Sequence, residues 1–307
     1  MSKYVAVVGG TGQIGTPMTK NLLKEGHKVR IVSRGKEHEV EEILNDHLAN
    51  GAEFVVCDDM QDVDKVAEAI KGCEVFVATV PGSETIITKF EPVWVEAAVK
   101  AGIKRFVPSE FGCHTRSIKS GDGFIFDNKM ELHEKIFKSG MDWTFVYNGY
   151  IFDYGLPNFR FYDEITTFGN VELPIYTHSI EDIGHHAALA ITDDRTVNKC
   201  VQMDYRCLTQ NEMVELVEKY WSNEPLVFKH YSTQYIQYMK DNSGDGITAK
   251  KGAETDRERW GINNVIYVLG KLAAFTDETL KASELWPDFV AKHPEEAIKD
   301  PKFFFEK

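Results

Sequence analysis

Short apolar segments alternate with amphipathic segments through the first half of the chain. The apolar segments are rich in valine and isoleucine, which is typical of strands buried on both faces. The segments between them repeat apolar residues every three or four positions, which predicts helices. Alternation of this kind indicates an α/β fold with a doubly wound parallel sheet. The predicted strands are 4–8, 28–33, 54–57, 75–80, 105–107 and 143–147, and the predicted helices are 14–25, 40–48, 63–70, 86–101 and 127–139.

The regular pattern weakens after Pro157, and we divide the chain near this point. Residues 1–154 are predicted to form the sheet domain, and 155–307 a smaller, partly discontinuous α/β domain that binds substrate. Within the second domain, 179–191 and 210–220 are expected to be helical, and 178–200 to pack back on the first domain. Glycine and polar residues at 241–252 predict an exposed loop, with a lid over a site as the alternative. Residues 286–307 are predicted to form a terminal helix and tail, with 303–305 docking on the body.

A glycine-rich turn joins the first predicted strand to the first predicted helix. It reads GGTGQIG from residue 9 to residue 15, and strand, turn, helix and second strand fit within about thirty residues. The glycines allow a tight turn, the close approach of a pyrophosphate, and close packing of helix on strand. Free N–H groups and the positive end of the helix dipole attract the phosphates. This Rossmann arrangement predicts dinucleotide contacts at Gly9, Thr11, Gly12, Gln13 and Ile14, the alternative being a glycine turn in another strand–helix–strand unit.

The end of the second strand indicates which dinucleotide binds. An acidic side chain there holds the ribose 2′-hydroxyl of NAD, whereas a cation suits the 2′-phosphate of NADP. The chain has Ser33 and Arg34 at this point, with Lys36 nearby and no acid before Glu37. A guanidinium can bind a phosphate through two parallel hydrogen bonds. We therefore predict NADPH as the cofactor, with Arg34 and Lys36 at its phosphate; a solvated surface arginine is the alternative.

Other candidate cofactor contacts follow the third, fourth and fifth strands. Ligands of a doubly wound sheet bind beyond the carboxyl ends of its strands. Asp59 and Met60 are expected to flank the adenine, although capping of the next helix by Asp62 would explain this segment without a ligand. The remaining predicted contacts are Thr79, Val80, Pro81, Ser109, Glu110 and Phe111.

Composition argues against several classes of function. The formal net charge of −13 argues against binding to nucleic acid or to an anionic membrane. No apolar run approaches the roughly 18 residues of a transmembrane helix, and no signal-peptide pattern is recognised. Five scattered cysteines without CxxC spacing indicate reduced thiols in a cytoplasmic protein. His185 and His186 diverge on a predicted helix, so no metal site is expected. We expect a monomer or homodimer that binds a small molecule.

Three segments read VVGGTGQIG (7–15), RFVPSEFG (105–112) and DIG (182–184). Together they resemble the NmrA-like atypical short-chain dehydrogenases, most closely the isoflavone reductase and phenylcoumaran benzylic ether reductase branch. The resemblance implies an NADPH-dependent reductase that acts on small aromatic substrates of phenylpropanoid or isoflavone type. It also implies a catalytic lysine early in the helix after PSEFG, a position that Lys129 matches. The arginine that the family commonly has four residues later is replaced here by His133.

Lys129 is the candidate catalytic residue and is also expected to contact the cofactor. Asp127 or Asn128 is expected to cap its helix, with Asn128 and Glu131 at capping-box spacing, so Lys129 would lie in the first turn. There the helix dipole and flanking apolar residues favour a neutral amine suited to proton transfer. Lys129 would protonate a developing alkoxide, or deprotonate a phenol so that a reducible quinone methide forms. The alternative is a surface lysine on an amphipathic helix.

Aromatic and imidazole side chains near the sixth strand complete the predicted site. Tyr147 and Tyr150 are expected to form a wall beside the nicotinamide. Phe152, Tyr154 and His133 are expected to contact the substrate, His133 as a proton relay or hydrogen-bond partner. A structural role in the core is the alternative for each of them.

Two alternative functions remain to be weighed. Tyr267 and Lys271 have the Tyr-x-x-x-Lys spacing of most short-chain dehydrogenases, but they come far too late in the chain, so we interpret the spacing as chance. The absence of a Tyr-x-x-x-Lys pair after the fifth predicted strand argues against a sugar-nucleotide epimerase. A non-catalytic NADP(H) sensor that acts through a protein partner is the main alternative to the reductase. Lys129 favours the enzyme, because a sensor does not need it.

Overall fold

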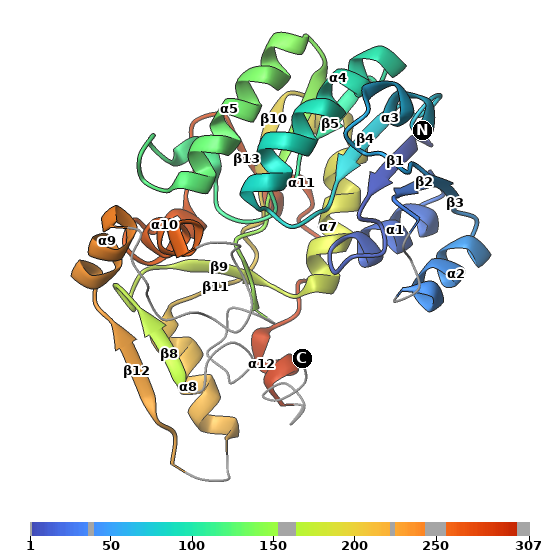
Figure 1. Cartoon of the computed structure of the whole chain (residues 1–307). Helices are drawn as coiled ribbons and strands as arrows, with labels where there is room; N and C mark the ends of the chain where they lie inside the picture. Colours follow the sequence, from blue (N-terminus) through green and yellow to red (C-terminus); the bar gives the residue numbers. More distant parts are fainter. Residues whose placement is uncertain (1, 36–39, 153–163, 222–224, 243–255, 300–307) are drawn as a thin grey trace.

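An eight-stranded parallel sheet forms the body of the protein (Figure 1). The computed structural model describes the chain except for residues 1, 36–39, 153–163, 222–224, 243–255 and 300–307. The strand order is β13-β10-β6-β5-β4-β1-β2-β3, so β2 and β3 extend the sheet on one side of β1, and β4, β5 and β6 extend it on the other. In such sheets the crevice between the two directions of growth, here between β1 and β4, is the usual ligand site. The strands are β1 (Tyr4–Val8), β2 (Lys28–Ser33), β3 (Glu53–Val56), β4 (Val75–Ala78), β5 (Arg105–Val107), β6 (Asp142–Tyr147), β10 (Lys199–Gln202) and β13 (Thr279–Lys281).

Helices cover both faces of this sheet (Figure 1). Alternate residues of a strand point to opposite faces, and β1 shows the consequence. Val5 and Val7 pack in one apolar cluster with residues of α1 and α7, whereas Ala6 and Val8 pack in the cluster beneath α3, α4 and α5. The helices are α1 (Gly15–Lys24), α2 (Glu41–Ala49), α3 (Val63–Ala69), α4 (Glu91–Ala101), α5 (Phe124–Ser139) and α7 (Ile180–Thr192), and a π-helical turn, η1 (Ile86–Phe90), precedes α4.

The second half of the chain adds two small sheets and further helices below the large sheet (Figure 1). β7, β9 and β11 form one small sheet, and β8 pairs with β12 in the other. α10 packs against α9 and against α5, which joins the second half to the first. The strands are β7 (Tyr150–Ile151), β8 (Ile165–Phe168), β9 (Ile175–His178), β11 (Cys207–Leu208) and β12 (Phe228–Tyr231); the helices are α8 (Gln210–Tyr220), α9 (Thr233–Asn242), α10 (Asp256–Tyr267), α11 (Ala282–Leu285) and α12 (Pro294–Ile298), with short 3₁₀ turns η2 (Thr115–Ser117), η3 (Asp194–Thr196) and η4 (Lys271–Ala273).

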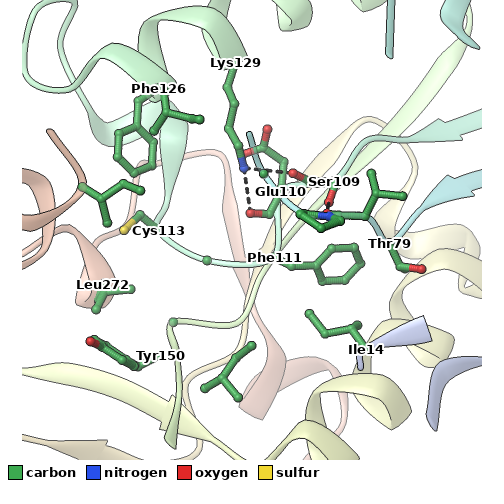
Figure 2. Close-up of a pocket in the computed structure, with 18 of the residues that line it drawn as sticks. Ile14, Thr79, Ser109, Glu110, Phe111, Cys113, Phe126, Lys129, Tyr150 and Leu272 are labelled. Atoms are coloured by element: carbon green, nitrogen blue, oxygen red, sulfur yellow. Dashed lines mark hydrogen bonds and ion pairs between the residues drawn. The ribbon is translucent and has the colours of Figure 1, made fainter. Parts of the chain in front are cut away.

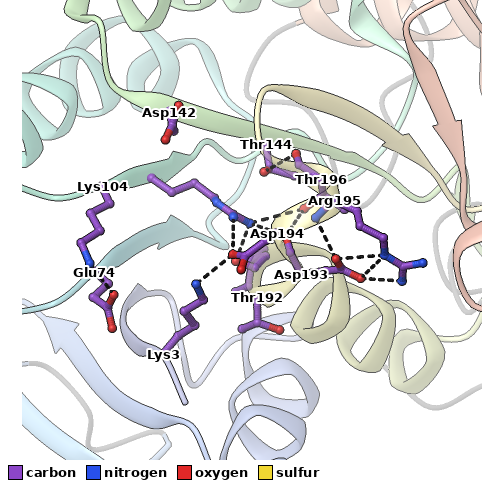
Figure 3. A network of polar contacts seen from close by, with 12 residues as sticks. Lys3, Glu74, Lys104, Asp142, Thr144, Thr192, Asp193, Asp194, Arg195 and Thr196 are labelled. Atoms are coloured by element: carbon purple, nitrogen blue, oxygen red, sulfur yellow. Dashed lines mark hydrogen bonds and ion pairs between the residues drawn. The ribbon is translucent and has the colours of Figure 1, made fainter. Parts of the chain in front are cut away.

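A polar network fixes the edge of the sheet at which β1 and β5 begin (Figure 3). The buried Arg105 donates hydrogen bonds to the carbonyl oxygens of Ile191 and Asp193, each over 3.0 Å. Asp194 accepts from Lys3 over 2.9 Å. The network ties the end of α7 and η3 to the first strands of the sheet, on the side away from the strands' carboxyl ends.

The large sheet and most elements of the first half confirm the sequence prediction. The six predicted strands are β1 to β6, all in one parallel sheet. The predicted helices near 179–191 and 210–220 are α7 and α8, and α8 has a capping box between Thr209 and Glu212. The pairing of β10 and β13 beside β6 was not predicted. The division into domains at residue 154 stays a prediction.

Two predicted helix boundaries are wrong. α5 begins at Phe124 with Gly123 as its N-cap, so neither Asp127 nor Asn128 caps it. Tertiary packing decides this start, because Gly123 lies against α10, where a Cβ atom would come within 2.9 Å of the Gly261 carbonyl oxygen. Residues 286–293 are not helical, and the short α12 replaces the predicted terminal helix. Residues 303–305 and most of the predicted loop at 241–252 lie outside the described residues. Among the described residues, no helix is both long enough and apolar enough to cross a membrane.

Candidate functional site

A cavity of about 700 Å³ lies at the carboxyl ends of β1, β4 and β5. Figure 2 shows the glycine turn and Thr79 on one side of it and the apolar side chains of Phe126 and Leu272 on the other. Lys129 reaches in from α5. The volume falls within the range of roughly 300–1,000 Å³ that small-molecule sites occupy. The predicted site residues that line it are Gly12, Gln13, Ile14, Thr79, Val80, Pro81, Ser109, Glu110, Phe111, Lys129 and Tyr150.

The glycine turn on one side of the cavity has the geometry of a phosphate-binding turn. Gly9 has a φ of +81°, and a Cβ atom there would lie 2.5 Å from the carbonyl oxygen of Thr79. A Cβ atom on Gly15 would lie 1.9 Å from the Gly9 carbonyl oxygen, so α1 can start close to β1 only without a side chain. Ile14 provides no side-chain cap, and the first turn of α1 contains no acid. The Thr16 N–H donates to the Gly12 carbonyl oxygen over 2.8 Å, and Pro17 has no N–H, so an anion would bind the N–H groups just before them, at residues 13–15.

The PSEFG segment after β5 holds the cavity wall together through hydrogen bonds. The Ser109 hydroxyl donates to the Val80 carbonyl oxygen over 2.6 Å, and the Ser109 N–H donates to Glu91 Oε1 over 2.8 Å. Glu91 is buried at the start of α4. Burial raises the pKa of the Glu91 carboxyl to about 7, although the Ser109 N–H and Lys129 act in the opposite direction. Ser109 therefore joins the loops after β4 and β5 to α4.

Glu110 is a buried carboxylate with three polar neighbours. It accepts a hydrogen bond from the Thr115 hydroxyl over 2.5 Å, its Oε1 lies 2.9 Å from His133 Nε2, and its Oε2 lies 3.8 Å from Lys129 Nζ. Burial alone would raise the pKa of the Glu110 carboxyl, but Lys129, His133 and Thr115 together lower it to about 2. Glu110 is therefore ionised at physiological pH and places a fixed negative charge beside Lys129.

Lys129 is buried, and its amine is held by the backbone of the PSEFG segment. Nζ donates hydrogen bonds to the carbonyl oxygens of Ser109 and Glu110, each over 2.9 Å (Figure 2). These two carbonyl oxygens and the nearby Glu110 carboxylate fix the position of the amine. The predicted place of Lys129 in the first turn of α5 is wrong, because the helix starts at Phe124. The neutral amine, which also rested on the apolar residues around Lys129, stays a prediction.

The wall opposite the glycine turn is apolar and comes partly from the second half of the chain. Ile262 and Ile266 of α10 and Leu272 of η4 line the cavity beside Ile125 and Phe126 of α5. Sequence reasoning missed the residues of α10 and η4. Their spacing on one face of a helix predicts burial but not the surface against which they are buried. An apolar wall of this kind suits the face of an aromatic ring.

A model of the NmrA-like family matches residues 1–290. The chain belongs to the NmrA-like family. The matched residues include the glycine turn, the PSEFG segment and the DIG segment of α7. The resemblance predicted from these motifs is therefore confirmed.

Similar proteins of known activity align with this NmrA-like protein over nearly its full length. The bifunctional pinoresinol-lariciresinol reductase 1 of Linum usitatissimum is 26% identical over 92% of this chain and 94% of its own. The isoflavone reductase homolog A622 of Nicotiana glauca is 27% identical over 92% of this chain and 93% of its own. The solved structure of AtPrR2 with NADP+ and (+)pinoresinol superposes with a TM-score of 0.78 at 25% identity, covering 97% of this chain and 98% of that one.

On the substrate and nicotinamide side, three predicted site residues of this NmrA-like protein do not line the cavity. His133 stacks on Phe145, with ring centroids 4.0 Å apart, and its Nε2 is hydrogen-bonded to Glu110. Its ring therefore positions the Glu110 carboxylate in place of the expected contact with substrate. Tyr147 is fully buried and packs on His114, with centroids 4.4 Å apart, so it forms no wall for a nicotinamide. Phe152 is buried in the hydrophobic core.

The predicted contacts of the adenosine half lie outside this cavity. The side chain of Arg34 is exposed just after β2. Met60 is buried, and its carbonyl oxygen accepts from Trp94 Nε1 over 2.9 Å. Asp59 is exposed, and Asp62 caps α3 as the alternative reading expected. Gly9 and Thr11 belong to the turn without lining the cavity, and Lys36 and Tyr154 lie outside the described residues.

Proposed function

We propose that this protein is an NADPH-dependent reductase that transfers hydride to a small aromatic substrate, with Lys129 as the proton donor. The enzyme class agrees with its relatives, which are named as reductases of pinoresinol and lariciresinol and as an isoflavone reductase homolog. The cofactor agrees with the solved structure of AtPrR2, which contains NADP+. The observation that carries the proposal is the position of Lys129. Its ammonium lies in a cavity that has a phosphate-binding turn on one side and an apolar wall on the other.

The residues of the glycine turn fit a bound dinucleotide. The turn excludes Cβ atoms at Gly9 and Gly15, and the start of α1 lacks both a side-chain cap and an acid. Gly12, Gln13 and Ile14 would hold the diphosphate, and Arg34 would bind the 2′-phosphate. NADPH, when bound, supplies the hydride. The protein then has to exclude water, orient the substrate and provide a proton.

Lys129 provides that proton in the proposed reaction. Two of its N–H groups are held by the carbonyl oxygens of Ser109 and Glu110, and the proposal assigns the third to the substrate oxygen. As hydride adds to the substrate carbon, the electron pair of the C=O π bond or of the breaking benzylic C–O bond moves to oxygen. Lys129 transfers its proton to this oxygen, and the neutral amine regains a proton from solvent. In the alternative route, a neutral Lys129 amine would deprotonate a phenol so that a reducible quinone methide forms.

The test is the oxidation of NADPH with a panel of aromatic aldehydes, enones and benzylic ethers. We expect Lys129→Ala to lower kcat/KM at least 100-fold for any substrate of the wild type, since general acid catalysis typically contributes 10²–10⁴-fold. Its dissociation constant for NADPH should change only a few-fold. Lys135→Ala, an exposed position on the same helix, is the matched control and should keep its activity.

Two outcomes would contradict the proposal. Retained turnover in Lys129→Ala would remove Lys129 from the mechanism. NADPH binding by the wild type without oxidation across the whole panel would favour the NADP(H) sensor, whose expected signature is a stable protein partner in a pull-down.

A further inference from the structure

A pair of tyrosine hydroxyls lies at the cavity wall away from Lys129. Tyr150 lines the cavity, and its hydroxyl is hydrogen-bonded to that of Tyr267, the last residue of α10. Figure 2 shows Tyr150 beneath Leu272, across the cavity from Lys129. The sequence suggested a different role for each residue: Tyr150 as a wall beside the nicotinamide, and Tyr267 as half of a chance Tyr-x-x-x-Lys match.

Tyr267 is fixed by its own surroundings, so it can position Tyr150. Its ring stacks on Phe168, with centroids 5.0 Å apart and planes 16° apart. Its carbonyl oxygen accepts a hydrogen bond from the Asn170 N–H over 2.9 Å. Gly169 has a φ of +56°, and a Cβ atom there would lie 2.3 Å from the same oxygen. The end of α10 is therefore packed tightly against the turn after β8.

The chemistry of the pair suits hydrogen bonding to a ligand. A tyrosine hydroxyl can donate one hydrogen bond and accept two. When Tyr267 donates to Tyr150, the proton of Tyr150 can be donated to a ligand, and the first bond polarises the second. Burial raises the pKa of Tyr150 to about 12, although the hydrogen bond with Tyr267 acts in the opposite direction. The hydroxyl of Tyr150 therefore remains a donor at neutral pH.

Most other polar side chains of the cavity wall bind groups of the protein itself. The Thr79 hydroxyl lies 3.0 Å from the carbonyl oxygens of Val8 and Gly9, and Ser109 donates to Val80. The carboxylate of Glu110 is bound to His133 and Thr115. The lining of the cavity also includes the apolar side chains of Ile125, Phe126, Ile262, Ile266 and Leu272.

We propose that Tyr150, positioned by Tyr267, is a specificity-determining residue that donates a hydrogen bond to a phenolic oxygen of the substrate. This oxygen lies at the end of the aromatic ring away from the oxygen that Lys129 protonates. The inference rests on the proposed function and narrows its substrate class to aromatic compounds with oxygen at both ends. An aryl compound without the second oxygen would lack the hydrogen bond to Tyr150, which disfavours its binding relative to the phenol.

The test compares two ligands that differ by one hydroxyl. Calorimetry measures the dissociation constants of 4-hydroxycinnamaldehyde and cinnamaldehyde in the presence of saturating NADP+, which prevents turnover. The proteins are the wild type, Tyr150→Phe, Tyr267→Phe and the control Tyr238→Phe, an exposed tyrosine of α9. We expect the wild type and the control to prefer the phenol about tenfold, the usual effect of one hydrogen bond. Tyr150→Phe should lose this preference by weaker binding of the phenol alone, and Tyr267→Phe should lose part of it.

Each result decides the proposal. It is overturned if the folded Tyr150→Phe variant keeps the tenfold preference, or if the wild type shows none or binds neither aldehyde. Thermal melting establishes that each variant is folded. Tyr267→Phe tests the Tyr150–Tyr267 hydrogen bond by removing the hydroxyl of the second tyrosine. Turnover separates this inference from the proposed function. A preference for the phenol without NADPH oxidation by any protein of the set would refute the reductase and support the hydrogen bond from Tyr150. Turnover without that preference would support the reductase and refute the hydrogen bond from Tyr150.

Discussion

The prediction of NADPH over NADH depends on one side chain, Arg34. It is exposed just after β2, where the adenosine ribose lies in sheets of this kind. We expect Arg34→Ser to raise the dissociation constant for NADPH about 10- to 100-fold, because charge-assisted hydrogen bonds contribute about 1.5–3 kcal/mol. The constant for NADH should change little. Fluorescence titration of both nucleotides measures this, with Lys28→Ser at the other end of β2 as the control. Equal constants for both nucleotides in wild type and variant would contradict the assignment.

Individual site residues can be predicted from the sequence where they belong to a local backbone structure. The glycine turn and the PSEFG segment are local structures, so their residues could be predicted before the fold was known. The place of His133 could not be predicted, because it depends on tertiary contacts: its ring stacks on Phe145 and binds the Glu110 carboxylate. Tyr147 and Tyr150 differ because Gly149, with a φ of +70°, turns the chain between them. Which of the two faces the cavity depends on that turn and not on the aromatic pattern.

Helices α1 and α7 pack so closely that a side chain at Gly184 would clash. A Cβ atom at Gly184 would lie 2.5 Å from Pro17 Cγ and 2.7 Å from the Met18 nitrogen. We expect Gly184→Ala to lower the free energy of unfolding by about 1–3 kcal/mol through overpacking, although helix propensity alone would raise it by about 1 kcal/mol. NADPH binding should weaken as well, because α1 presents the glycine turn.

Urea unfolding and NADPH titration measure these two effects. Glu181→Ala, at an exposed position of α7, is the control and should change both quantities little. An unchanged or higher stability of Gly184→Ala would mean that α1 and α7 can move apart without loss, against the close packing inferred here.

The errors in predicting elements have a common physical cause. Strands β1 to β6 were predicted because each is an apolar run within a regular alternation, whereas β10 and β13 are short strands from distant parts of the chain. Their place in the sheet follows from pairing with β6, a long-range contact that no local pattern encodes. The start of α5 was missed for the same reason. Its boundary is set by the approach of Gly123 to Gly261 in α10.

In the whole molecule, the cavity is assembled by contacts between the two halves of the chain. Glu258 of α10 accepts a hydrogen bond from the Glu84 N–H over 2.7 Å, just after the cavity residues that follow β4. The same helix brings Ile262 and Ile266 to the wall and ends at Tyr267. In the proposed function, the glycine turn and the PSEFG segment form the side that would receive the cofactor, whereas α10 forms much of the side that would select the substrate.

The stability of the whole molecule should depend on pH through two buried carboxyls of opposite behaviour. The pKa of the Glu110 carboxyl is lowered from 4.5 to about 2, so between these pH values Glu110 is ionised in the native state and protonated in the unfolded state. The protein therefore loses the stability that Glu110 contributes as the pH falls from about 4.5 to 2. Glu91 has its pKa raised from 4.5 to about 7. Between these values its native state binds more protons than the unfolded state, so its contribution to stability falls as the pH rises.

Glu91→Gln isolates the second effect, because glutamine keeps the acceptor for the Ser109 N–H and does not ionise. Wild type should lose stability relative to Glu91→Gln between pH 4.5 and pH 7, by on the order of 3 kcal/mol if the whole shift from 4.5 to about 7 is realised. Urea unfolding at closely spaced pH values measures the difference, and Glu96→Gln, at an exposed position of the same helix, should run parallel to wild type. Parallel curves for Glu91→Gln and wild type would show that Glu91 ionises normally, and that its hydrogen bond to Ser109 and the nearby Lys129 outweigh its burial.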